Sequence, residues 1–315
     1  MHLFVTGGAG FIGSAFVRIV LAEAPDCRVT TFDALTYAGN LDNVHDLDGK
    51  RHRFIQGDIV DRDAVRGALA DRPDAILNFA AESHVDRSIQ ASDAFLRTNV
   101  LGAQVLLDAA RAFGVKRFLQ VSTDEVMGSL PDDDSSYFTE ASPYAPNNPY
   151  AASKAAAEHL VRAAHHTFGL DTVITRCGNN YGPRQHREKL IPLLLTNALH
   201  DRPIPVYGDG RNIRDWIYVD DHCRAILAVL RRGRIGEIYN IGARNERRNI
   251  DVVTSVLAAL GKPASLIQFV PDRLGHDRRY AIDPTKIEQE LGWRPRETWE
   301  SGLAKTIAWY QAKWR

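Results

Sequence analysis

Short apolar runs alternate with longer mixed segments along the first part of the chain. Helix-favouring segments, such as 14–24, 91–113 and 150–168, separate the apolar runs, which fall at 3–5, 28–32, 54–59, 75–81, 118–121 and 172–177. The run 75–81 is one apolar stretch, as expected for a parallel strand that is covered on both faces. Strands and helices that alternate at these spacings predict an α/β fold with a doubly wound, Rossmann-type parallel sheet.

The pattern changes after residue 178, where a turn-rich segment leads into a basic and polar one. Two later segments, 217–231 and 237–242, return to the helix and strand pattern of the first part. We therefore predict a Rossmann domain formed by 1–178 and 217–242, and a smaller, discontinuous α/β substrate domain formed by 179–216 and 243–315. The stripe of Leu303, Ile307 and Tyr310 on a final helix, 299–313, predicts packing in the core.

Composition limits the class of partner. The 315 residues include 39 Lys and Arg and 39 Asp and Glu, so the formal net charge is zero. A balanced charge gives no reason to expect a nucleic acid or an anionic membrane as a partner. It does not exclude a local basic groove for a phosphorylated small molecule. The three cysteines, Cys27, Cys177 and Cys223, are far apart and form no C-x-x-C pair, so we expect reduced thiols and no metal site.

The N-terminal residues and the lengths of the apolar runs indicate where in the cell the protein is found. Met1 leads straight into an apolar strand, which leaves no room for a signal peptide. No apolar run approaches the ~18 residues of a membrane span. We therefore expect a cytoplasmic protein.

A glycine-rich turn follows the first predicted strand. Gly7, Gly10 and Gly13 have a G-x-x-G-x-x-G spacing immediately before a helix. Such glycines let the backbone approach a pyrophosphate at a helix N-terminus, although alone they are as often a structural turn. Asp33 ends the second strand, twenty residues past Gly13, where an acid binds the adenosine ribose hydroxyls and repels a ribose phosphate. The pattern predicts NAD rather than NADP.

Later strand ends add candidate cofactor contacts. Asp58 follows the third strand and could hold an adenine amino group, while Ala80 and Ala81 end the fourth strand over the phosphates or ribose. Asn99 lies within the predicted helix 91–113, where it could bind the cofactor or serve helix packing.

Two clusters, 122–125 and 150–154, carry the candidate chemistry. Tyr150 and Lys154 are four residues apart in an alanine-rich segment, so they share one helix face. A lysine and a positively charged nicotinamide would lower the pKa of the phenol and make it a base for a substrate hydroxyl. A hydroxyl from Ser122 or Thr123 could share the developing oxyanion. Oxidation by hydride transfer needs no more than these groups.

Two adjacent carboxyls, Asp124 and Glu125, are present as well, and oxidation by hydride transfer does not require them. Side chains of neighbouring residues face opposite ways in a strand, but where the strand ends both can reach one substrate. A protonated acid and an ionised base could together remove water from a sugar. The alternative is a solvated loop acid beside a helix-capping acid.

Arginines of the second half are dispersed in loops with Tyr, Trp and His, as in 211–216, 247–249 and 272–280. Arginines that bind phosphate and aromatic rings that contact a base suit a groove for a nucleoside diphosphate. For any single arginine, a solvated surface position is the alternative.

These motifs together resemble the extended short-chain dehydrogenases/reductases, and within them the dTDP-glucose 4,6-dehydratases, over essentially the whole chain. The glycine loop 6–13 and Tyr150-x-x-x-Lys154 are shared by the wider superfamily. The triplet 123–125 separates dehydratases from epimerases and decarboxylases. Further similar segments are 80–89, 179–183, 188–192, 214–216 and 275–280.

The resemblance implies an NAD-dependent hydro-lyase acting on a nucleoside-diphosphate sugar, with dTDP-glucose as the first choice. Tyr150, held by Lys154 and Thr123, would deprotonate the hydroxyl at sugar carbon 4 as its hydride passes to NAD. Glu125 would take the proton of carbon 5 while Asp124 protonates the hydroxyl leaving carbon 6. The hydride then returns to carbon 6 and gives a 4-keto-6-deoxy sugar nucleotide.

The same resemblance implies the remaining contacts and a homodimer formed through the Tyr150 helix and the helix before it. The implied NAD contacts are Gly7, Gly10, Phe11, Ile12, Gly13, Asp33, Thr36, Asp58, Ile59, Ala80, Ala81, Thr98, Asn99, Tyr150, Lys154 and Asn180. The implied substrate contacts are Ser83, Thr123, Asn179, Lys189, Leu190, Pro205, Tyr207, Arg214, Asn249, Arg273 and His276.

Some positions depart from the family. Met127 stands where an aromatic residue is usual, Gly178 replaces another small residue, the loop 128–150 is shorter than in some members, and 184–187 is unusually polar. These departures leave the substrate preference and the turnover rate open. Two rivals remain: a sugar-nucleotide epimerase or decarboxylase, which the acid pair disfavours, and a non-catalytic NAD sensor, which an intact Tyr–Lys pair disfavours.

Overall fold

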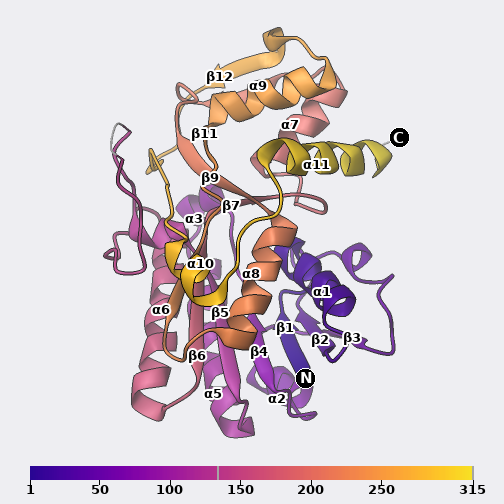
Figure 1. Cartoon of the computed structure of the whole chain (residues 1–315), viewed down its shortest axis with the longest axis vertical. Coiled ribbons are helices and arrows are strands. Elements are labelled where there is room, and N and C mark those ends of the chain that lie inside the picture. Colours follow the sequence, from indigo (N-terminus) through magenta and orange to yellow (C-terminus); the bar gives the residue numbers. More distant parts are fainter. Residues whose placement is uncertain (133–134, 314–315) are drawn as a thin grey trace.

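A seven-stranded parallel sheet forms the centre of the computed structural model, which describes residues 1–132 and 135–313 (Figure 1). Its strand order is β10-β6-β5-β4-β1-β2-β3, so the chain winds outward from β1 in both directions. Every neighbouring pair in this sheet is parallel. The strands are β1 (His2–Thr6), β2 (Arg28–Asp33), β3 (His52–Gln56), β4 (Ala75–Asn78), β5 (Arg117–Thr123), β6 (Thr172–Cys177) and β10 (Ile238–Ile241). The predicted doubly wound fold is confirmed.

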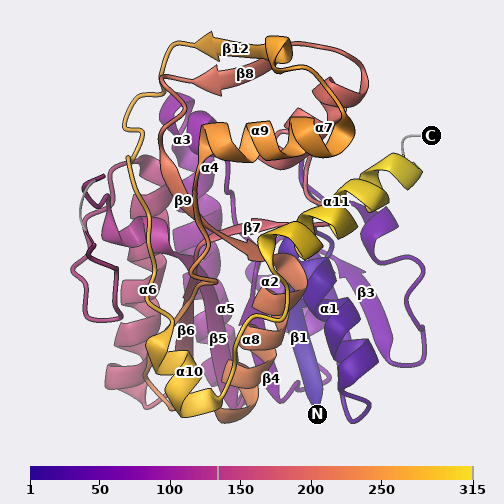
Figure 2. The same cartoon turned by 45° about the horizontal axis from the view of Figure 1, so that its top comes forward.

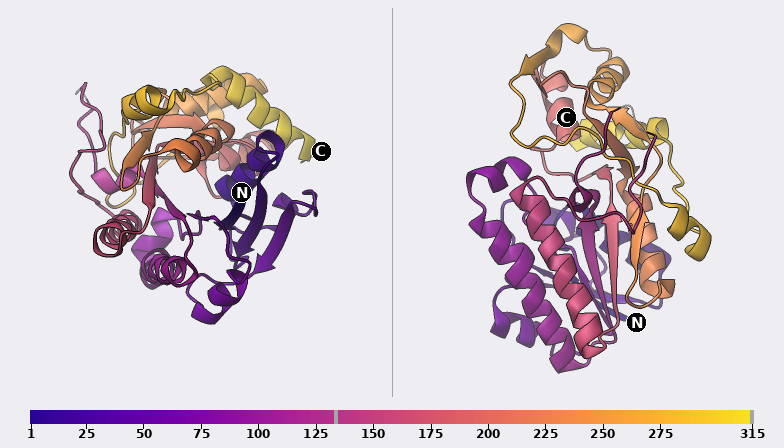
Figure 3. Two further views of the ribbon diagram at one scale, coloured as in Figure 1. Left: turned by 60° about the horizontal axis from the view of Figure 1, so that its bottom comes forward. Right: turned by 90° about the vertical axis from the view of Figure 1, so that its left-hand side faces the viewer.

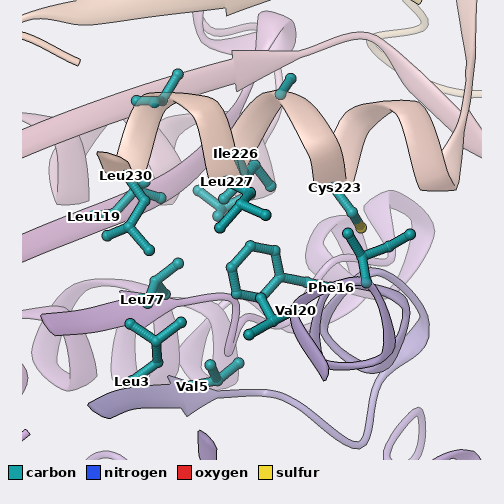
Figure 4. Close-up of a cluster of buried hydrophobic side chains, with 14 of the residues drawn as sticks. Leu3, Val5, Phe16, Val20, Leu77, Leu119, Cys223, Ile226, Leu227 and Leu230 are labelled. Carbon is teal, nitrogen blue, oxygen red and sulfur yellow. The ribbon is translucent and has the colours of Figure 1, made fainter. Parts of the chain in front are cut away.

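Helices cover both faces because successive strand residues point to opposite sides of the sheet. Leu3 and Val5 of β1 pack with α1 (Phe11–Glu23) and α8 (Val219–Arg232), as Figure 4 shows. Phe4, between them, packs on the other face, which is covered by α2 (Arg62–Ala68), α5 (Ala103–Phe113) and α6 (Pro149–Phe168). Strands buried on both sides explain the long apolar runs of the sequence.

The predicted helix 91–113 is in fact composite. It consists of α4 (Asp93–Phe95), a π-helical stretch (Leu96–Gly102) and α5, and a separate helix, α3 (Val85–Gln90), precedes it. Short 3₁₀ turns lie at Leu41–Asn43, Asp124–Met127 and Ala264–Leu266.

A second group of elements lies beyond the carboxyl ends of the large sheet, where Figures 2 and 3 show it from other sides. It contains a three-stranded sheet, β11-β9-β7, and a parallel pair of β8 with β12. The elements are β7 (Asn179–Tyr181), β8 (Ile204–Tyr207), β9 (Ile213–Tyr218), β11 (Glu246–Arg248), β12 (Ile267–Val270), α7 (Leu190–Leu199), α9 (Asn249–Leu260) and α11 (Trp299–Lys313). Leu303, Ile307 and Tyr310 of α11 lie in its core, as predicted.

The chain passes between the two groups more than once. α8 and β10 return to the large sheet, and α10 (Thr285–Leu291) also packs there through Ile287 and Leu291. The division at residues 178, 217 and 242 stays a prediction, and α10 lies with the first group although its residues were assigned to the second. Within the part of the chain that the structure describes, no helix has the length and apolar character needed to span a bilayer.

Candidate active site

The glycine loop joins β1 to α1 at the carboxyl edge of the sheet. Gly7 has φ +67°, and a Cβ there would lie 2.5 Å from the backbone nitrogen of Ala80. A Cβ on Gly13 would lie 2.2 Å from the carbonyl oxygen of Gly7. Only glycine fits these positions, so bare backbone and the N-terminus of α1 face the groove above the sheet. Such a cradle fits a dinucleotide pyrophosphate.

Asp33 ends β2 beside this loop. Its carboxylate accepts hydrogen bonds from the backbone N–H groups of Ala9 (2.9 Å) and Leu35 (2.8 Å). Burial raises the pKa of Asp33, and the two hydrogen bonds oppose that rise. The carboxylate is thus fixed at the groove, where it can accept hydrogen bonds from two ribose hydroxyls and would repel a phosphate.

A long groove over this edge contains nearly all the predicted cofactor contacts. Those that line it are Gly7, Gly10, Phe11, Ile12, Gly13, Asp33, Thr36, Asp58, Ile59, Ala80, Ala81, Thr98, Tyr150, Lys154 and Asn180. The sequence analysis missed Tyr37, Gln185 and His186, which also line it. These three come from irregular loops, where no periodicity marks a residue that faces a groove.

Asn99 is placed differently from the other predicted cofactor residues. Its side-chain oxygen accepts a hydrogen bond from the backbone N–H of Glu82 (2.9 Å). Its amide nitrogen donates to the carbonyl oxygen of Glu82 (3.0 Å) and to Ser153 Oγ (2.8 Å). Both ends of the amide therefore fasten the segment after β4 to α6, as the packing alternative supposed, and its contact with NAD stays a prediction.

Thr123, Asp124 and Glu125 lie where β5 passes into a 3₁₀ turn. The Thr123 hydroxyl accepts a hydrogen bond from the Glu125 N–H (3.3 Å) and donates to Asp124 Oδ1 (3.2 Å). The second Asp124 oxygen, Oδ2, is buried and has no hydrogen-bond partner among the described residues. The end of the strand thus brings both carboxyls to the groove, because both line it.

The two carboxyls differ electrostatically. Burial raises the pKa of Asp124 well above its ordinary value, and the negative charges of Glu125 and Asp215 add to the rise. Burial also raises the pKa of Glu125, but the cations Arg214 and Lys189 oppose this rise. The pKa of Asp124 is thus raised further than that of Glu125, which suits Asp124 as the proton donor and Glu125 as the base, and these two roles stay a prediction.

Tyr150 and Lys154 lie in the first turns of α6. Lys154 Nζ donates a hydrogen bond to the carbonyl oxygen of Val121 in β5 (2.7 Å), which ties the helix to the strand that ends in the acid pair. Burial lowers the pKa of Lys154 to about 8, and Glu158, one turn further along α6, opposes the fall. Both side chains line the groove, so the predicted Tyr–Lys face is present.

The sequence predicted a lowered pKa for Tyr150, but the groups of the protein itself raise it. Burial raises it well above the ordinary value, and the charge of Glu125 is the next largest cause of the rise. The expected lowering therefore depends on a cation beside the phenol, which an oxidised nicotinamide would supply.

A second cavity adjoins the groove, and both are lined by Glu125, Ser83, Asn179 and Lys189. The other predicted substrate residues that line the second cavity are Leu190, Pro205, Tyr207, Arg214, Asn249, Arg273 and His276. These residues come from widely separated parts of the chain. Asn148, which precedes α6, also lines this cavity and was not predicted. Tyr280, from the predicted loop 272–280, lines it as well, with its ring centre 4.2 Å from the Arg214 guanidinium carbon.

Arginines and a lysine give this cavity its positive side. Lys189 Nζ donates to the carbonyl oxygen of Ser83 (2.8 Å), across the junction between the two groups of elements. The Arg273 guanidinium pairs with Asp86 (2.6 Å) and lies 5.3 Å from the Tyr207 ring centre. Cations beside an aromatic ring suit the diphosphate and base of a nucleotide.

Met127, the departure from the family nearest the acid pair, lines neither cavity. It is buried behind α6, and its sulfur accepts a hydrogen bond from Arg176 (3.4 Å). Arg176 in turn forms a fully buried ion pair with Glu158 (2.8 Å). Met127 can therefore influence a substrate only through its neighbours.

A parallel doubly wound sheet with a glycine cradle, a strand-end acid and a Tyr–Lys pair defines the short-chain dehydrogenase/reductase class. The family described as GDP-mannose 4,6 dehydratase matches residues 4–306, and the chain belongs to this family. The resemblance inferred from the motifs is confirmed.

Most relatives of high identity share one name, while a Haloferax volcanii relative, 53% identical over 98% of each chain, is named Low-salt glycan biosynthesis protein Agl12. A dTDP-glucose 4,6-dehydratase of Xanthomonas campestris pv. campestris (strain B100) is 53% identical, over 97% of this chain and 92% of that protein. One from Neisseria gonorrhoeae is 51% identical, over 98% of this chain and 95% of that protein. The match spans nearly whole proteins, so the two groups of elements are both included.

Solved structures extend the comparison. DesIV, a dTDP-glucose 4,6-dehydratase of Streptomyces venezuelae with NAD and TYD bound, has a TM-score of 0.96 and 53% identity, over 99% of this chain and 97% of that chain. A UDP-glucose 4-epimerase of Thermus thermophilus in complex with NAD still has a TM-score of 0.91 at 31% identity, over 99% of each chain. The fold is common to both reactions, so only the site residues can discriminate between them.

Proposed function

We propose that the chain is an NAD-dependent dTDP-glucose 4,6-dehydratase. The observation that carries this proposal is the Asp124–Glu125 pair: both carboxyls line the dinucleotide groove together with Tyr150, and Glu125 also lines the second cavity. An epimerase needs only oxidation and reduction at carbon 4, so it has no use for a second acid and base. The names of the most similar relatives support the same choice.

The glycine cradle and Asp33 would hold NAD, which supplies a hydride acceptor when bound. Tyr150 would remove the proton of the hydroxyl at carbon 4, with Lys154 beneath it as a cation and Thr123 as a hydrogen-bond partner of the oxygen. The resulting ketone acidifies the proton at carbon 5. Glu125 would then take that proton, while Asp124 gives its own proton to the hydroxyl that leaves carbon 6.

The burial of Asp124 supports this assignment. An acid that must deliver a proton near neutral pH has to keep it, and the surrounding burial and carboxylates raise the pKa of Asp124 well above the usual range. Glu125 has Arg214 and Lys189 to stabilise its charged form. Of the two carboxyls, Asp124 therefore has the pKa that is raised further, which suits a proton donor beside a base.

Turnover of dTDP-glucose tests the function directly. The purified protein should convert dTDP-glucose to dTDP-4-keto-6-deoxyglucose without added NAD, because the hydride is returned in each cycle and the cofactor is not consumed. The keto product is measured by its absorbance in alkali, in parallel with UDP-, CDP- and GDP-glucose. Recovery of unchanged sugars, or of a galactose epimer, would contradict the proposal.

We also propose a homodimer formed through α5 and α6. Leu96 and Leu101, in the π-helical stretch that packs against both helices, are 53% and 45% exposed, and a second subunit on this face would cover them. Light scattering should give the mass of two chains, and Leu96→Asp with Leu101→Asp should shift it toward one. A wild-type monomer would refute this assembly.

The cytoplasm is the proposed location. Cys27, Cys177 and Cys223 are all buried free thiols, which suits a reducing compartment.

A further inference from the structure

Arg214 is a buried cation of the second cavity. It lies in β9, is 7% exposed and lines the cavity. Its terminal nitrogens donate to the backbone carbonyl oxygens of Ile213 (2.7 Å), Arg278 (3.3 Å) and Asp277 (2.8 Å). Among the described residues, each of its hydrogen bonds goes to a carbonyl and none to a carboxylate. Because a buried charge is expected to have a counter-ion, this guanidinium suits an anionic group of a ligand in the cavity.

The ring of Tyr280 supports the guanidinium from one side. Its centre lies 4.2 Å from the guanidinium carbon of Arg214, and Tyr280 is 4% exposed. The backbone N–H of Tyr280 donates to the carbonyl oxygen of Ile213 (3.1 Å), so the ring and the arginine are carried by adjoining backbone segments. A guanidinium that lies against an aromatic face is attracted by the ring and has less freedom to turn.

The carboxylate of Asp277 fixes this ring in turn. Its Oδ2 accepts a hydrogen bond from the Tyr280 hydroxyl (2.5 Å), and its Oδ1 accepts one from Asn147 Nδ2 (2.6 Å). Asp277 is 5% exposed and also lines the cavity. Asn147 lies just before α6, the helix that carries Tyr150. A single carboxylate therefore connects the support of Arg214 to the segment that leads into the catalytic helix.

We propose that Tyr280 and Asp277 are positioning residues that hold Arg214 where it binds the diphosphate of the nucleotide sugar. The inference rests on the proposed function, because the substrate of that function supplies the diphosphate. The hydrogen bond to Asn147 also limits the distance between this diphosphate anchor and α6. A substrate held by its diphosphate would then present its sugar to Tyr150 in a constant orientation.

Binding of dTDP and of thymidine to the protein loaded with NAD tests the proposal, because only dTDP carries a diphosphate. Tyr280→Leu removes the ring and the hydroxyl, and dTDP should bind about tenfold more weakly. Tyr280→Phe keeps the ring but frees it from Asp277, and the loss should be about threefold. Thymidine binding should stay at the wild-type level in both variants. Calorimetry measures dTDP binding, and competition with dTDP measures thymidine binding.

Tyr239→Phe is a matched control. It removes a phenol hydroxyl that donates to a carboxylate, that of Glu290 (2.8 Å), from a buried residue that lines neither cavity. This variant should bind both ligands like the wild type.

A double variant separates positioning of Arg214 from direct contact with the ligand. Arg214→Met should itself weaken dTDP binding, since the anchor is lost. Adding Tyr280→Leu to Arg214→Met should cost no further affinity, because the ring then has no guanidinium to hold. A purely structural role of Tyr280 would instead give two losses that add.

The outcomes distinguish this inference from the proposed function. Wild-type dTDP affinity in the Tyr280 variants, an equal loss of dTDP and thymidine binding, or additive losses in the double variant would overturn the positioning role. If Tyr280→Leu fails to fold, Tyr280→Phe decides, because it lacks a single hydroxyl. A wild-type protein that binds no dTDP and is inactive on all four sugar nucleotides would overturn the proposed function itself.

Discussion

Glu125→Gln is expected to bind NAD and dTDP-glucose and to stop before the loss of water. The amide has nearly the same shape as the carboxylate but cannot take the proton of carbon 5. Loss of a general base costs about 10²–10⁴-fold in rate, so formation of the keto-deoxy sugar should fall by that factor. Tyr150 and Lys154 are untouched, so oxidation at carbon 4 should still occur and reduced cofactor should accumulate, visible in its absorbance.

Asp124→Asn is the matched variant. It should also block water loss, because the amide cannot protonate the leaving hydroxyl, but Glu125 remains to remove the proton. In heavy water, Asp124→Asn should therefore exchange the hydrogen of carbon 5 for deuterium and Glu125→Gln should not. Full activity of Glu125→Gln would remove this residue from the mechanism, and exchange in both variants would assign the base elsewhere.

Arg176→Met should destabilise the fold more than any surface substitution. The Arg176 and Glu158 side chains are 1% and 0% exposed, and the guanidinium donates to the Glu158 carboxylate through Nε and a terminal nitrogen at 2.8–3.2 Å. Removing one partner leaves an uncompensated buried charge, which costs about 3–5 kcal/mol in the free energy of unfolding. The measurement is the urea midpoint and the melting temperature relative to wild type.

Two control variants test whether the loss of stability comes from the unpaired buried charge. Arg176→Met combined with Glu158→Leu removes both charges, so it should recover much of the lost stability. Arg231→Met breaks the pair of Arg231 with Asp26 (2.9 Å), which is largely exposed, and should cost no more than about 1 kcal/mol. If Arg176→Met melted like Arg231→Met, the buried pair would not hold β6 to α6.

The local motifs were predictable because their geometry is set by neighbours in the chain. The spacing of Gly7, Gly10 and Gly13 with Asp33 indicated a dinucleotide cradle, and the structure places these residues together at one groove. Tyr150 and Lys154 share a helix face by their spacing alone. The apolar runs predicted the doubly wound sheet, since parallel strands covered on both faces must be continuously apolar.

Other features had no local signal. From the sequence alone, Asn99 could bind the cofactor or serve helix packing. Its hydrogen bonds to Glu82 and Ser153 depend on where α6 lies. Met127 looked like a change beside the acid pair, yet its side chain points to the buried Arg176. The composite helix through Leu96–Gly102 was also missed, because a change from i→i+4 to i→i+5 hydrogen bonds needs no particular residue type and leaves no mark in the sequence.

By itself, the sequence determined the fold class, the cradle and the identity of the chemical groups, because these depend on residue type and on spacings of a few residues. Only the tertiary structure decided which groups meet and with what charge. Glu125, Arg214 and Lys189 are far apart in the chain, and their proximity opposes the rise in the pKa of Glu125 that burial causes, whereas the pKa of the buried Asp124 is raised well above its ordinary value. The pKa of a group depends on its burial and on the charges near it, and both of these are fixed only when the chain has folded.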